Sequence, residues 1–328
     1  MKDKKAKPPY KRVISWIAWA ILVQFILMNI SAAFYAYSFT HLYSEEQRVK
    51  DVSAPIAKNV FAKTWRLFKG YRYYKTGVSD KPAFPCKTIV LHTKNGLAIN
   101  TWLSTVDSAK GTVLLFHGLT GNKNELIHQA EFFHDQHYNV MLADIRAHGQ
   151  SEGTRTSIGF YESEEVHLLY DYVQKSGEKN IYLWGASMGA VIVMKAAAEY
   201  NLSLKGIICE MPFESLHDHI QSRLDIIGFP SEPFASFVTF WIGAEQGFWA
   251  FGFNSTKYAK KIQCPVLLMC GDKDELVEKE ETNNIFTALG SADKHLVWYE
   301  GSGHHSLMNE DPALWKNEVN HFLTRINK

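Results

Sequence analysis

Cysteine and net charge are both scarce in this chain of 328 residues. Four cysteines are too few for a disulfide framework in so long a chain. With 35 basic and 34 acidic residues, the formal net charge of +1 gives no electrostatic reason to expect nucleic acid as a partner. The chain has no internal repeat and no low-complexity tract, and its 46% hydrophobic content is that of an ordinary globular protein. We therefore expect neither a disordered chain, nor a collagen-like repeat, nor a disulfide-stapled miniprotein.

A long uncharged run is present at the N-terminus. Residues 13–37 carry no charge, and about 20 apolar residues are enough for a helix to cross the hydrocarbon core of a bilayer. Residues 1–12 contain six basic residues and one acidic residue. The positive-inside rule predicts a cytoplasmic tail, a transmembrane signal anchor and a domain on the extracytoplasmic side. A cleaved signal peptide is the alternative, because Ser31-Ala32-Ala33 is a small-residue cluster of the kind that signal peptidase accepts.

Residues 38–85 are expected to form a juxtamembrane linker. Within it, residues 44–75 alternate apolar and basic side chains, and Pro55 interrupts any single helix. Such a stretch is expected either to lie on anionic lipid headgroups or to form a solvated linker with one face packed on the main domain. Its basic residues weaken the orientation argument, since they lie on the side predicted to be outside.

Residues 86–328 are expected to form one α/β domain. An Asn95-Gly96 turn joins two β-rich runs, which predicts a hairpin. Short apolar runs then alternate with segments of helical periodicity such as Glu162–Gln174 and Met188–Tyr200, which predicts a parallel sheet buried on both faces. The apolar runs are Thr112–Phe116, Asn139–Ala143, Asn180–Trp184, Leu204–Cys209, Pro265–Cys270 and His295–Tyr299.

The regular spacing is broken by an insertion at about residues 211–263. This segment is rich in phenylalanine and tryptophan. Its simplest interpretation is a helical cap over the ends of the sheet strands, and a set of ordinary core helices is the alternative.

Chemistry is indicated first by Gly185-Ala186-Ser187-Met188-Gly189, which fits the pattern G-x-S-x-G. The motif follows the predicted strand Ile181–Trp184 and precedes the predicted helix Met188–Tyr200. In that context the serine lies on a tight strand-to-helix turn, and the glycines on either side leave room for it. Ser187 is therefore the candidate nucleophile, with the start of the helix directed at developing negative charge.

A serine nucleophile needs a base, and the base needs an acid that orients it. Two later strands are followed by suitable groups, Asp272 and Asp274 after the first and His304 and His305 after the second. The carboxyl ends of parallel strands share one edge of a sheet, so these side chains are expected to lie near Ser187. The order Ser, Asp, His along the chain is typical of α/β-hydrolases.

From about residue 86 onward the chain resembles an α/β-hydrolase, and more narrowly the membrane-anchored serine-aminopeptidase and monoacylglycerol-lipase-like group. The resemblance rests on Leu115–Gly118, Asp144–Ser151, Gly185–Gly189, Gly271–Asp274 and Gly303-His304. These pieces are specific for the fold and the triad, and poorly specific for the substrate.

The resemblance implies roles for individual residues. It implies Asp274 rather than Asp272 as the acid and His304 rather than His305 as the base, with Glu210 as a further contender for the acid. It also implies an oxyanion hole made by the backbone amides of Leu119 and Met188. No cofactor is expected.

Other polar residues are expected to be structural. The resemblance implies that His117, Asp144, Arg146 and His148 brace loops around the site. No metal site is expected, because at most two of the three histidines between residues 128 and 137 share a helix face and no ligand set completes them. The cysteines are expected to be free, since Cys264 and Cys270 bracket a single strand.

The sequence thus predicts a membrane-anchored serine hydrolase that cleaves carboxylic esters. The aromatic insertion and the anchor favour an acyl or lipid-like substrate, because apolar walls favour burial of a chain. Two alternatives stay open, a serine peptidase or amidase of the same fold and a non-catalytic scaffold. The sequence does not predict the oligomeric state.

Overall fold

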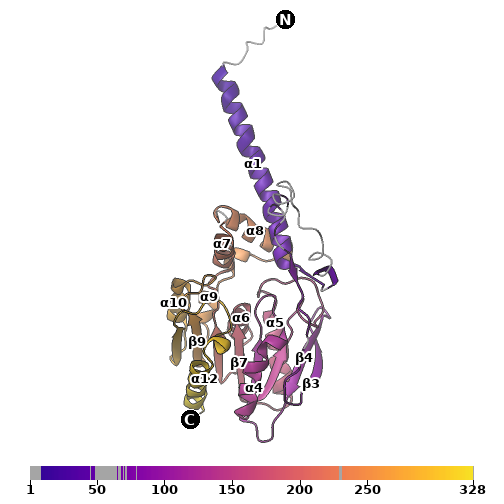
Figure 1. Cartoon of the computed structure of the whole chain (residues 1–328), viewed down its shortest axis with the longest axis vertical. Coiled ribbons are helices and arrows are strands. Elements are labelled where there is room, and N and C mark those ends of the chain that lie inside the picture. Colours follow the sequence, from indigo (N-terminus) through magenta and orange to yellow (C-terminus); the bar gives the residue numbers. More distant parts are fainter. Residues whose placement is uncertain are drawn as a thin grey trace.

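The computed structural model describes residues 9–44, 46–48, 65, 68, 70, 72–78, 80–228 and 231–327. At its centre is an eight-stranded sheet with the order β10-β9-β8-β7-β5-β6-β4-β3 (Figure 1). Strands β3 and β4 form the expected antiparallel hairpin, β4 also pairs antiparallel with β6, and the remaining pairs are parallel. The mostly parallel sheet is thereby confirmed. Its strands are β3 (Lys87–His92), β4 (Ala98–Ser104), β5 (Thr112–Phe116), β6 (Asn139–Ala143), β7 (Ile181–Ala186), β8 (Gly206–Glu210), β9 (Val266–Gly271) and β10 (Lys294–Tyr299).

Helices follow most strands. The predicted bounds agree well with those observed, and the helix expected at Glu162–Gln174 is shifted by one residue. The helices after the hairpin are η1 (Lys123–Leu126), α4 (Ile127–Asp135), α5 (Ser163–Lys175), α6 (Met188–Glu199), α7 (Leu216–Ile226), α8 (Phe234–Gln246), η2 (Ala250–Gly252), α9 (Ser255–Ala259), α10 (Lys279–Ala288), α11 (Leu307–Glu310) and α12 (Pro312–Ile326).

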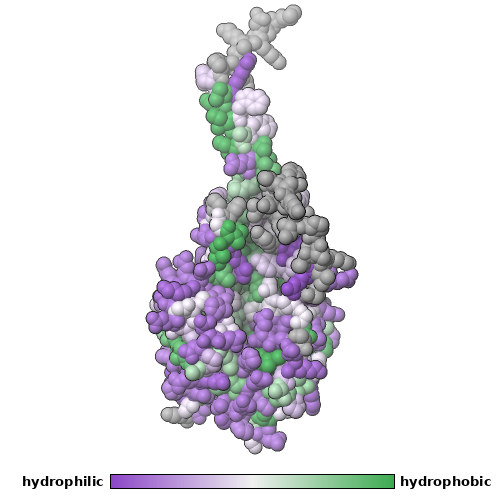
Figure 2. Space-filling view, in the orientation of Figure 1, coloured by the Kyte–Doolittle hydropathy of each residue, from purple (hydrophilic) through white to green (hydrophobic). Residues whose placement is uncertain are grey.

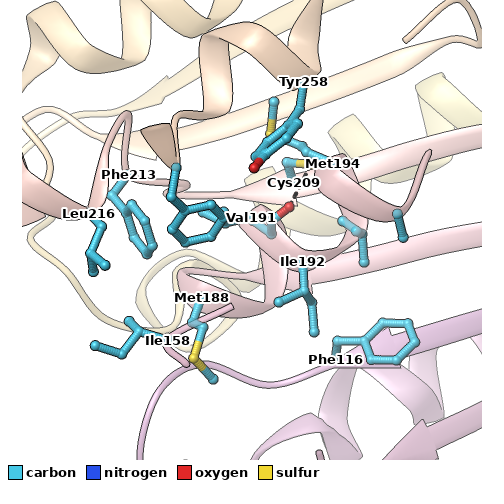
Figure 3. Packing of buried hydrophobic residues seen from close by; sticks show 14 of the residues in the cluster. Phe116, Ile158, Met188, Val191, Ile192, Met194, Cys209, Phe213, Leu216 and Tyr258 are labelled. Atoms are coloured by element: carbon cyan, nitrogen blue, oxygen red, sulfur yellow. Dashed lines mark hydrogen bonds between the residues drawn. The ribbon is translucent and has the colours of Figure 1, made fainter. Parts of the chain in front are cut away.

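Both faces of the sheet are covered, as strand β5 illustrates. All five of its residues are buried. Leu114 and Phe116 belong to one apolar cluster together with α5 and α6, whereas Val113 and Leu115 belong to another together with α4 and α12. Successive side chains of a strand point to opposite faces, so an uninterrupted apolar run is what a doubly covered strand requires. Figure 3 shows part of the first cluster, with Ile192 of α6 among its members.

The aromatic insertion is only partly a cap. Helices α7 and α8 lie at the end of the domain that faces the N-terminal helix α1 (Pro9–Thr40) (Figure 1). In contrast, α9 packs against α6 and α10 and belongs to the body of the domain. The expected cap at 211–263 is therefore too long at its C-terminal end, because α9 packs on α6 and α10 of the domain body.

Helix α1 has two environments. Its N-terminal part projects away from the domain with its side chains exposed, and hydrophobic residues line it in Figure 2. Its C-terminal part is docked on α8, with Ala32 and Ala36 fully buried and Tyr35 packed edge-on against Phe234 at 5.2 Å. The expected anchor at 13–37 thus overlaps a docked segment, because a helix that ended at the domain surface would leave the apolar face of α8 uncovered.

The expected linker at 38–85 begins inside α1, which continues to Thr40. Beyond it, β1 (Leu42–Tyr43) and β2 (Tyr73–Tyr74) pair in parallel, so the two ends of this segment are held side by side. Most of the basic, apolar stretch expected at 44–75 lies outside the described residues.

Candidate active site

Ser187 lies on a strained turn between β7 and α6. Its φ of 53° and ψ of −119° are rarely adopted by a residue with a side chain. The turn is tight because backbone passes close to both motif glycines. A Cβ on Gly185 would lie 2.3 Å from the carbonyl oxygen of Gly189, and a Cβ on Gly189 would lie 2.2 Å from that of Phe116. The amide of Ser187 donates to the carbonyl of Glu210 at 2.7 Å, which ties the turn to β8.

Three side chains from separate loops form a hydrogen-bonded row. Ser187 Oγ lies 2.9 Å from His304 Nε2, and His304 Nδ1 lies 2.7 Å from Asp274 Oδ2. A carboxylate only accepts hydrogen bonds, so Nδ1 carries the proton and Nε2 is free to accept from the serine hydroxyl. Asp274 Oδ1 accepts from the amides of Leu276 and Val277, which fixes the carboxylate. The structure therefore brings together Ser187, the candidate from the motif, and the two residues that the family resemblance implied.

The two expected oxyanion donors belong to segments next to Ser187, because Met188 follows it in the chain and Leu119 lines the same cavity. Met188 is the first residue of α6, where an amide has no acceptor within its own helix. The amide of Leu119 donates to no acceptor in the part of the chain that the structure describes. Gly118 is close enough that a Cβ on it would lie 3.4 Å from Ser187 Cβ. Both amides are thus available beside the nucleophile.

Histidines and a buried ion pair hold the neighbouring loop. His117 Nε2 accepts from the amide of Ile145 at 3.2 Å, and His148 Nε2 accepts from the amide of Thr120 at 3.2 Å. Burial lowers the pKa of His117 to about 4 and that of His148 to about 3, so both are neutral acceptors at neutral pH. These bonds agree with a bracing role rather than a role in proton transfer.

Asp144 anchors the same loop through a partner that sequence reasoning missed. Its carboxylate forms an ion pair with Lys123, and both side chains are fully buried. Asp144 Oδ1 also accepts from the amide of Lys123, and Oδ2 from that of Gln150. Arg146 points elsewhere and pairs with glutamates of α5. A lysine shortly after the Gly118 turn was a visible signal, but a surface position is the usual expectation for that residue type.

The competing acid and base candidates have other partners. Asp272 accepts from the amide of Gly301 at 2.6 Å and lies 3.4 Å from Lys279 Nζ, which makes it a turn residue. His305 faces Glu310 at 3.2 Å and is 56% exposed.

Glu210, the further contender for the acid, is fully buried. Its Oε1 accepts from the indole N–H groups of Trp184 and Trp315, at 3.0 and 2.6 Å. Burial raises its pKa to about 7. Its side chain bonds to these two indoles, and the His304 ring bonds to Asp274 and Ser187, so Glu210 is not part of the row.

A cavity of about 230 Å³ opens over Ser187. Besides the expected residues it is lined by Gln129, Glu125 and Arg223, none of which sequence reasoning singled out. Arg223 comes from α7, so the cap contributes a cation to the site. The signal for it was an arginine at helical spacing between Ile220, Leu224 and Ile227 on an otherwise apolar face.

Metal ligation has no support from the described residues, among which no group of three or more His, Cys, Asp or Glu side chains is arranged to hold an ion. His128 and His134 lie on α4, whereas His137 lies beyond its end, not on the same helical stretch as expected. The four cysteines are free, as predicted: Cys86, Cys209, Cys264 and Cys270.

Comparison with proteins of known sequence finds esterases and lipases. The uncharacterized protein YqkD of Bacillus subtilis is 26% identical over 220 residues, covering 66% of this chain and 72% of that protein. A carboxylesterase of Bacillus subtilis is 23% identical, covering 65% of this chain and 92% of its own length. Lysophosphatidylserine lipase ABHD12 of Danio rerio is 24% identical over 182 residues, with 52% of this chain and 45% of that protein covered. This chain thus matches less than half of the length of the lipase.

Solved structures and a family profile identify the fold. The Pyrococcus furiosus esterase Pf2001 superimposes with a TM-score of 0.65 at 22% identity, covering 77% of this chain and 98% of that one. A membrane phospholipase A superimposes with a TM-score of 0.56 at 19% identity, covering 74% and 87%. The Hydrolase_4 profile, described as serine aminopeptidase S33, matches residues 107–236 and 248–312. The chain therefore belongs to the serine aminopeptidase S33 family and has the α/β-hydrolase fold of an esterase or lipase-like enzyme.

Proposed function

We propose that the protein is a serine hydrolase that cleaves carboxylic esters through Ser187, His304 and Asp274. The observation that carries this proposal is the continuous hydrogen-bonded row from Asp274 through His304 to Ser187, at 2.7 and 2.9 Å. Each contact has the length of an ordinary hydrogen bond, so the row is assembled before substrate arrives. The two available amides beside Ser187 complete the set of groups that acyl transfer requires.

The proposed reaction has two halves. In the first, Ser187 Oγ attacks the ester carbonyl while His304 Nε2 takes the hydroxyl proton, and Asp274 stabilises the imidazolium and keeps it oriented. The amides of Leu119 and Met188 donate to the oxyanion of the tetrahedral intermediate. His304 then returns the proton to the leaving alcohol, and an acyl-enzyme remains. In the second half, water attacks the acyl group, with His304 again acting as base.

Peptide cleavage is the alternative reaction, since the family profile is described as serine aminopeptidase. An aminopeptidase needs a carboxylate that holds the free amine of its substrate, and the carboxyl groups lining the cavity are Glu125 and Glu210. Glu210 is a poor partner for an ammonium group, because its Oε1 is engaged by two indoles and its pKa is raised to about 7. Arg223 lines the same cavity and repels an ammonium group. An ester substrate needs no such anchor.

The anchor and the substrate class complete the proposal. The exposed part of α1 is long and apolar enough to cross a bilayer, and we propose that it does so with residues 1–12 in the cytoplasm and the domain on the extracytoplasmic side. A secreted form cleaved near Ala33 is the alternative. Cleavage there would separate Ala36 and the docked end of α1 from the rest of the helix. An acyl or lipid-like ester suits a site placed beside a membrane helix.

The test compares substrates on the purified full chain. A panel of p-nitrophenyl esters of rising chain length is set against aminoacyl anilides, with the variants Ser187→Ala and Ser176→Ala. Ser176 is an exposed serine at the end of α5 and serves as the matched control. We expect ester hydrolysis that falls by about 10⁴-fold or more in Ser187→Ala and is unchanged in Ser176→Ala. Hydrolysis of anilides at a rate comparable to that of esters would support the peptidase. If neither substrate class is turned over in a way that depends on Ser187, the chain is a non-catalytic scaffold.

A further inference from the structure

A second cavity, of about 260 Å³, adjoins the catalytic one. It lies where the docked end of α1 meets β2 and the two cap helices, and its walls are almost wholly apolar. The lining residues are Tyr35 and Phe39 of α1, Tyr73 of β2, Ile220, Arg223, Leu224 and Ile226 of α7, Ile227 directly after it, Val238 of α8 and Leu276. The N-terminal helix therefore forms part of a cavity wall in addition to any role as an anchor.

Two residues connect this cavity to the triad. Arg223 lines both cavities. Leu276 lines the apolar cavity, and its amide donates to Asp274 Oδ1 at 2.8 Å. Arg223 is thus a wall that the catalytic cavity and the apolar cavity share.

Arg223 has no acidic partner among the residues that the structure describes. Its Nε donates to His219 Nε2 at 2.9 Å, one Nη donates to Tyr73 OH at 3.3 Å, and the guanidinium lies 5.2 Å from the centre of the Phe39 ring. None of these partners is an acid, and among the described residues Arg223 forms no ion pair. A guanidinium has five N–H donors, of which two are used here, so three are left for a ligand.

His219 does not supply the missing charge balance. It is 1% exposed, and burial together with the neighbouring Arg223 holds its pKa well below the usual value, so it is neutral. Because its Nε2 accepts from Arg223, the proton is on Nδ1, which has no acceptor in the described part of the chain. The histidine therefore orients the guanidinium without compensating it.

We propose that the substrate is a single-chain ester with an anionic group near the ester bond, bound with its acyl chain in the apolar cavity and its anion on Arg223. This rests on the proposed function of Ser187 and adds the substrate class. Charge-assisted bonds from a planar guanidinium suit a phosphate or a carboxylate, and the aromatic bed under Arg223 leaves its free N–H edge for that contact. An arginine that only tied α1 to the cap would not discriminate between charged and neutral substrates.

The first experiment measures discrimination. Full-length wild type, Arg223→Gln and Arg223→Lys are assayed on monooleoylglycerol, on its phosphate monoester and on the monooleoyl ester of glyceric acid, each at equal mole fraction in neutral detergent micelles. Arg325→Gln, a surface arginine paired with Asp293, is the matched control. We expect Arg223→Gln to lower kcat/KM for an anionic ester by about tenfold or more and for the neutral ester by less than about threefold. The kcat/KM of Arg223→Lys for an anionic ester should lie between the values of wild type and Arg223→Gln, because lysine keeps the positive charge and lacks the planar pair of N–H donors.

The relative rates on the two anionic esters identify the anion. A preference for the phosphate or for the carboxylate that depends on Arg223 supports the proposal in either case. Equal losses on neutral and anionic esters would overturn it and leave Arg223 a structural residue.

The second experiment tests the apolar cavity. Ile227→Trp fills it from a position that is 47% exposed, so the change does not require the core to repack. Phe240→Trp, at an equally exposed position of α8 that does not line the cavity, is the control. We expect Ile227→Trp to lower kcat/KM for a p-nitrophenyl ester with a long chain by about tenfold, as loss of two buried methylene groups would, and to spare the acetate. An equal loss of kcat/KM for the long-chain ester and for the acetate would show that the acyl chain binds outside the apolar cavity.

Failure of this proposal is distinguishable from failure of the proposed function. If Ser187→Ala abolishes hydrolysis of the neutral ester while Arg223→Gln shows no selective loss, the hydrolase stands and the anionic substrate class falls. If no ester is hydrolysed in a way that depends on Ser187, both fall.

Discussion

The loops around Ser187 and the region around Arg223 are held in different ways. Ser187 lies in a turn fixed by backbone contacts, by neutral buried histidines and by the Lys123–Asp144 pair. Arg223 lies on aromatic rings contributed by α1 and β2. The family profile covers the first region and also Arg223, and it omits residues 237–247, which include most of α8, as well as all of α1 and β2. The wall of the apolar cavity is therefore only partly covered by the family profile, because Phe39 of α1, Tyr73 of β2 and Val238 of α8 lie outside it.

The largest effect is expected from Lys123→Met, which removes the buried ion pair that holds the loop near Ser187 and should lower the unfolding free energy. The change leaves Asp144 charged and fully buried without its cation, and breaking such a pair typically costs about 3–5 kcal/mol of unfolding free energy. Denaturant titration of wild type and variant measures the loss. Lys316→Met, on the surface of α12, is the control and should shift the midpoint very little. A change below about 1 kcal/mol for Lys123→Met would mean that the loop is not held by this pair.

Gly189→Ala tests the backbone contacts in the same region. The new Cβ would lie 2.2 Å from the carbonyl oxygen of Phe116, so the turn must shift, at a cost of about 1–3 kcal/mol. We expect hydrolysis of short and long esters to fall together. Gly77→Ala, where no atom lies within 4 Å of the added Cβ, is the matched control. Retention of wild-type activity in Gly189→Ala would show that the turn tolerates expansion.

Ala36→Trp addresses the other region. Ala36 is fully buried where α1 docks on α8, so a large side chain should separate the helix from the cap. Hydrolysis of long-chain esters is expected to fall several-fold more than hydrolysis of the acetate, because the apolar cavity loses its α1 wall. Ile21→Trp, on the exposed part of the same helix, should leave the ratio unchanged. If Ala36→Trp lowers hydrolysis of the long-chain ester and of the acetate equally, the docking of α1 affects the catalytic residues as well as the apolar cavity, which would contradict the contrast between the two regions.

The last prediction concerns Glu210, which lines the catalytic cavity. Its pKa is raised from 4.5 to about 7 in the folded state, so the folded protein binds this proton more tightly than the unfolded chain does. The stability of the folded state therefore falls as the pH rises from 4.5 to about 7. Glu210→Gln keeps an acceptor for Trp184 and Trp315 and cannot ionise. Relative to wild type it should be more stable at pH 8 by about 1–3 kcal/mol, with the difference vanishing near pH 4. A pH-independent difference, measured by thermal unfolding at both values, would contradict the assignment.

Sequence patterns predicted the body of the domain better than its cap. Strands β5 and β6 have the predicted bounds because uninterrupted apolar runs between turn signals have few other solutions in an α/β chain. Ser187 was predicted because the G-x-S-x-G motif between a strand and a helix reports the local backbone that positions the serine. The strand ends offered two aspartates and two histidines, and the choice of Asp274 and His304 came from the resemblance to the family.

The features that sequence patterns missed depend on contacts between distant segments. Hydropathy identifies α1 as an apolar helix, but that Ala36 is buried on α8 follows from tertiary packing that no periodicity encodes. The same holds for Lys123, whose burial requires Asp144, and for Arg223, whose position between two cavities requires Phe39 from the other end of the chain. The aromatic content of residues 211–263 indicated a cap without showing where it ends.

Peptide mapping of a covalent adduct tests the central claim most directly. The full chain is treated with a fluorophosphonate and digested, and the modified peptide is sequenced by mass spectrometry in wild type, Ser187→Ala and His304→Ala. Our account predicts one adduct, on Ser187, which is absent in Ser187→Ala and forms at least about 10³-fold more slowly in His304→Ala because the base is missing. An adduct on another residue, or labelling of Ser187 that does not depend on His304, would contradict it.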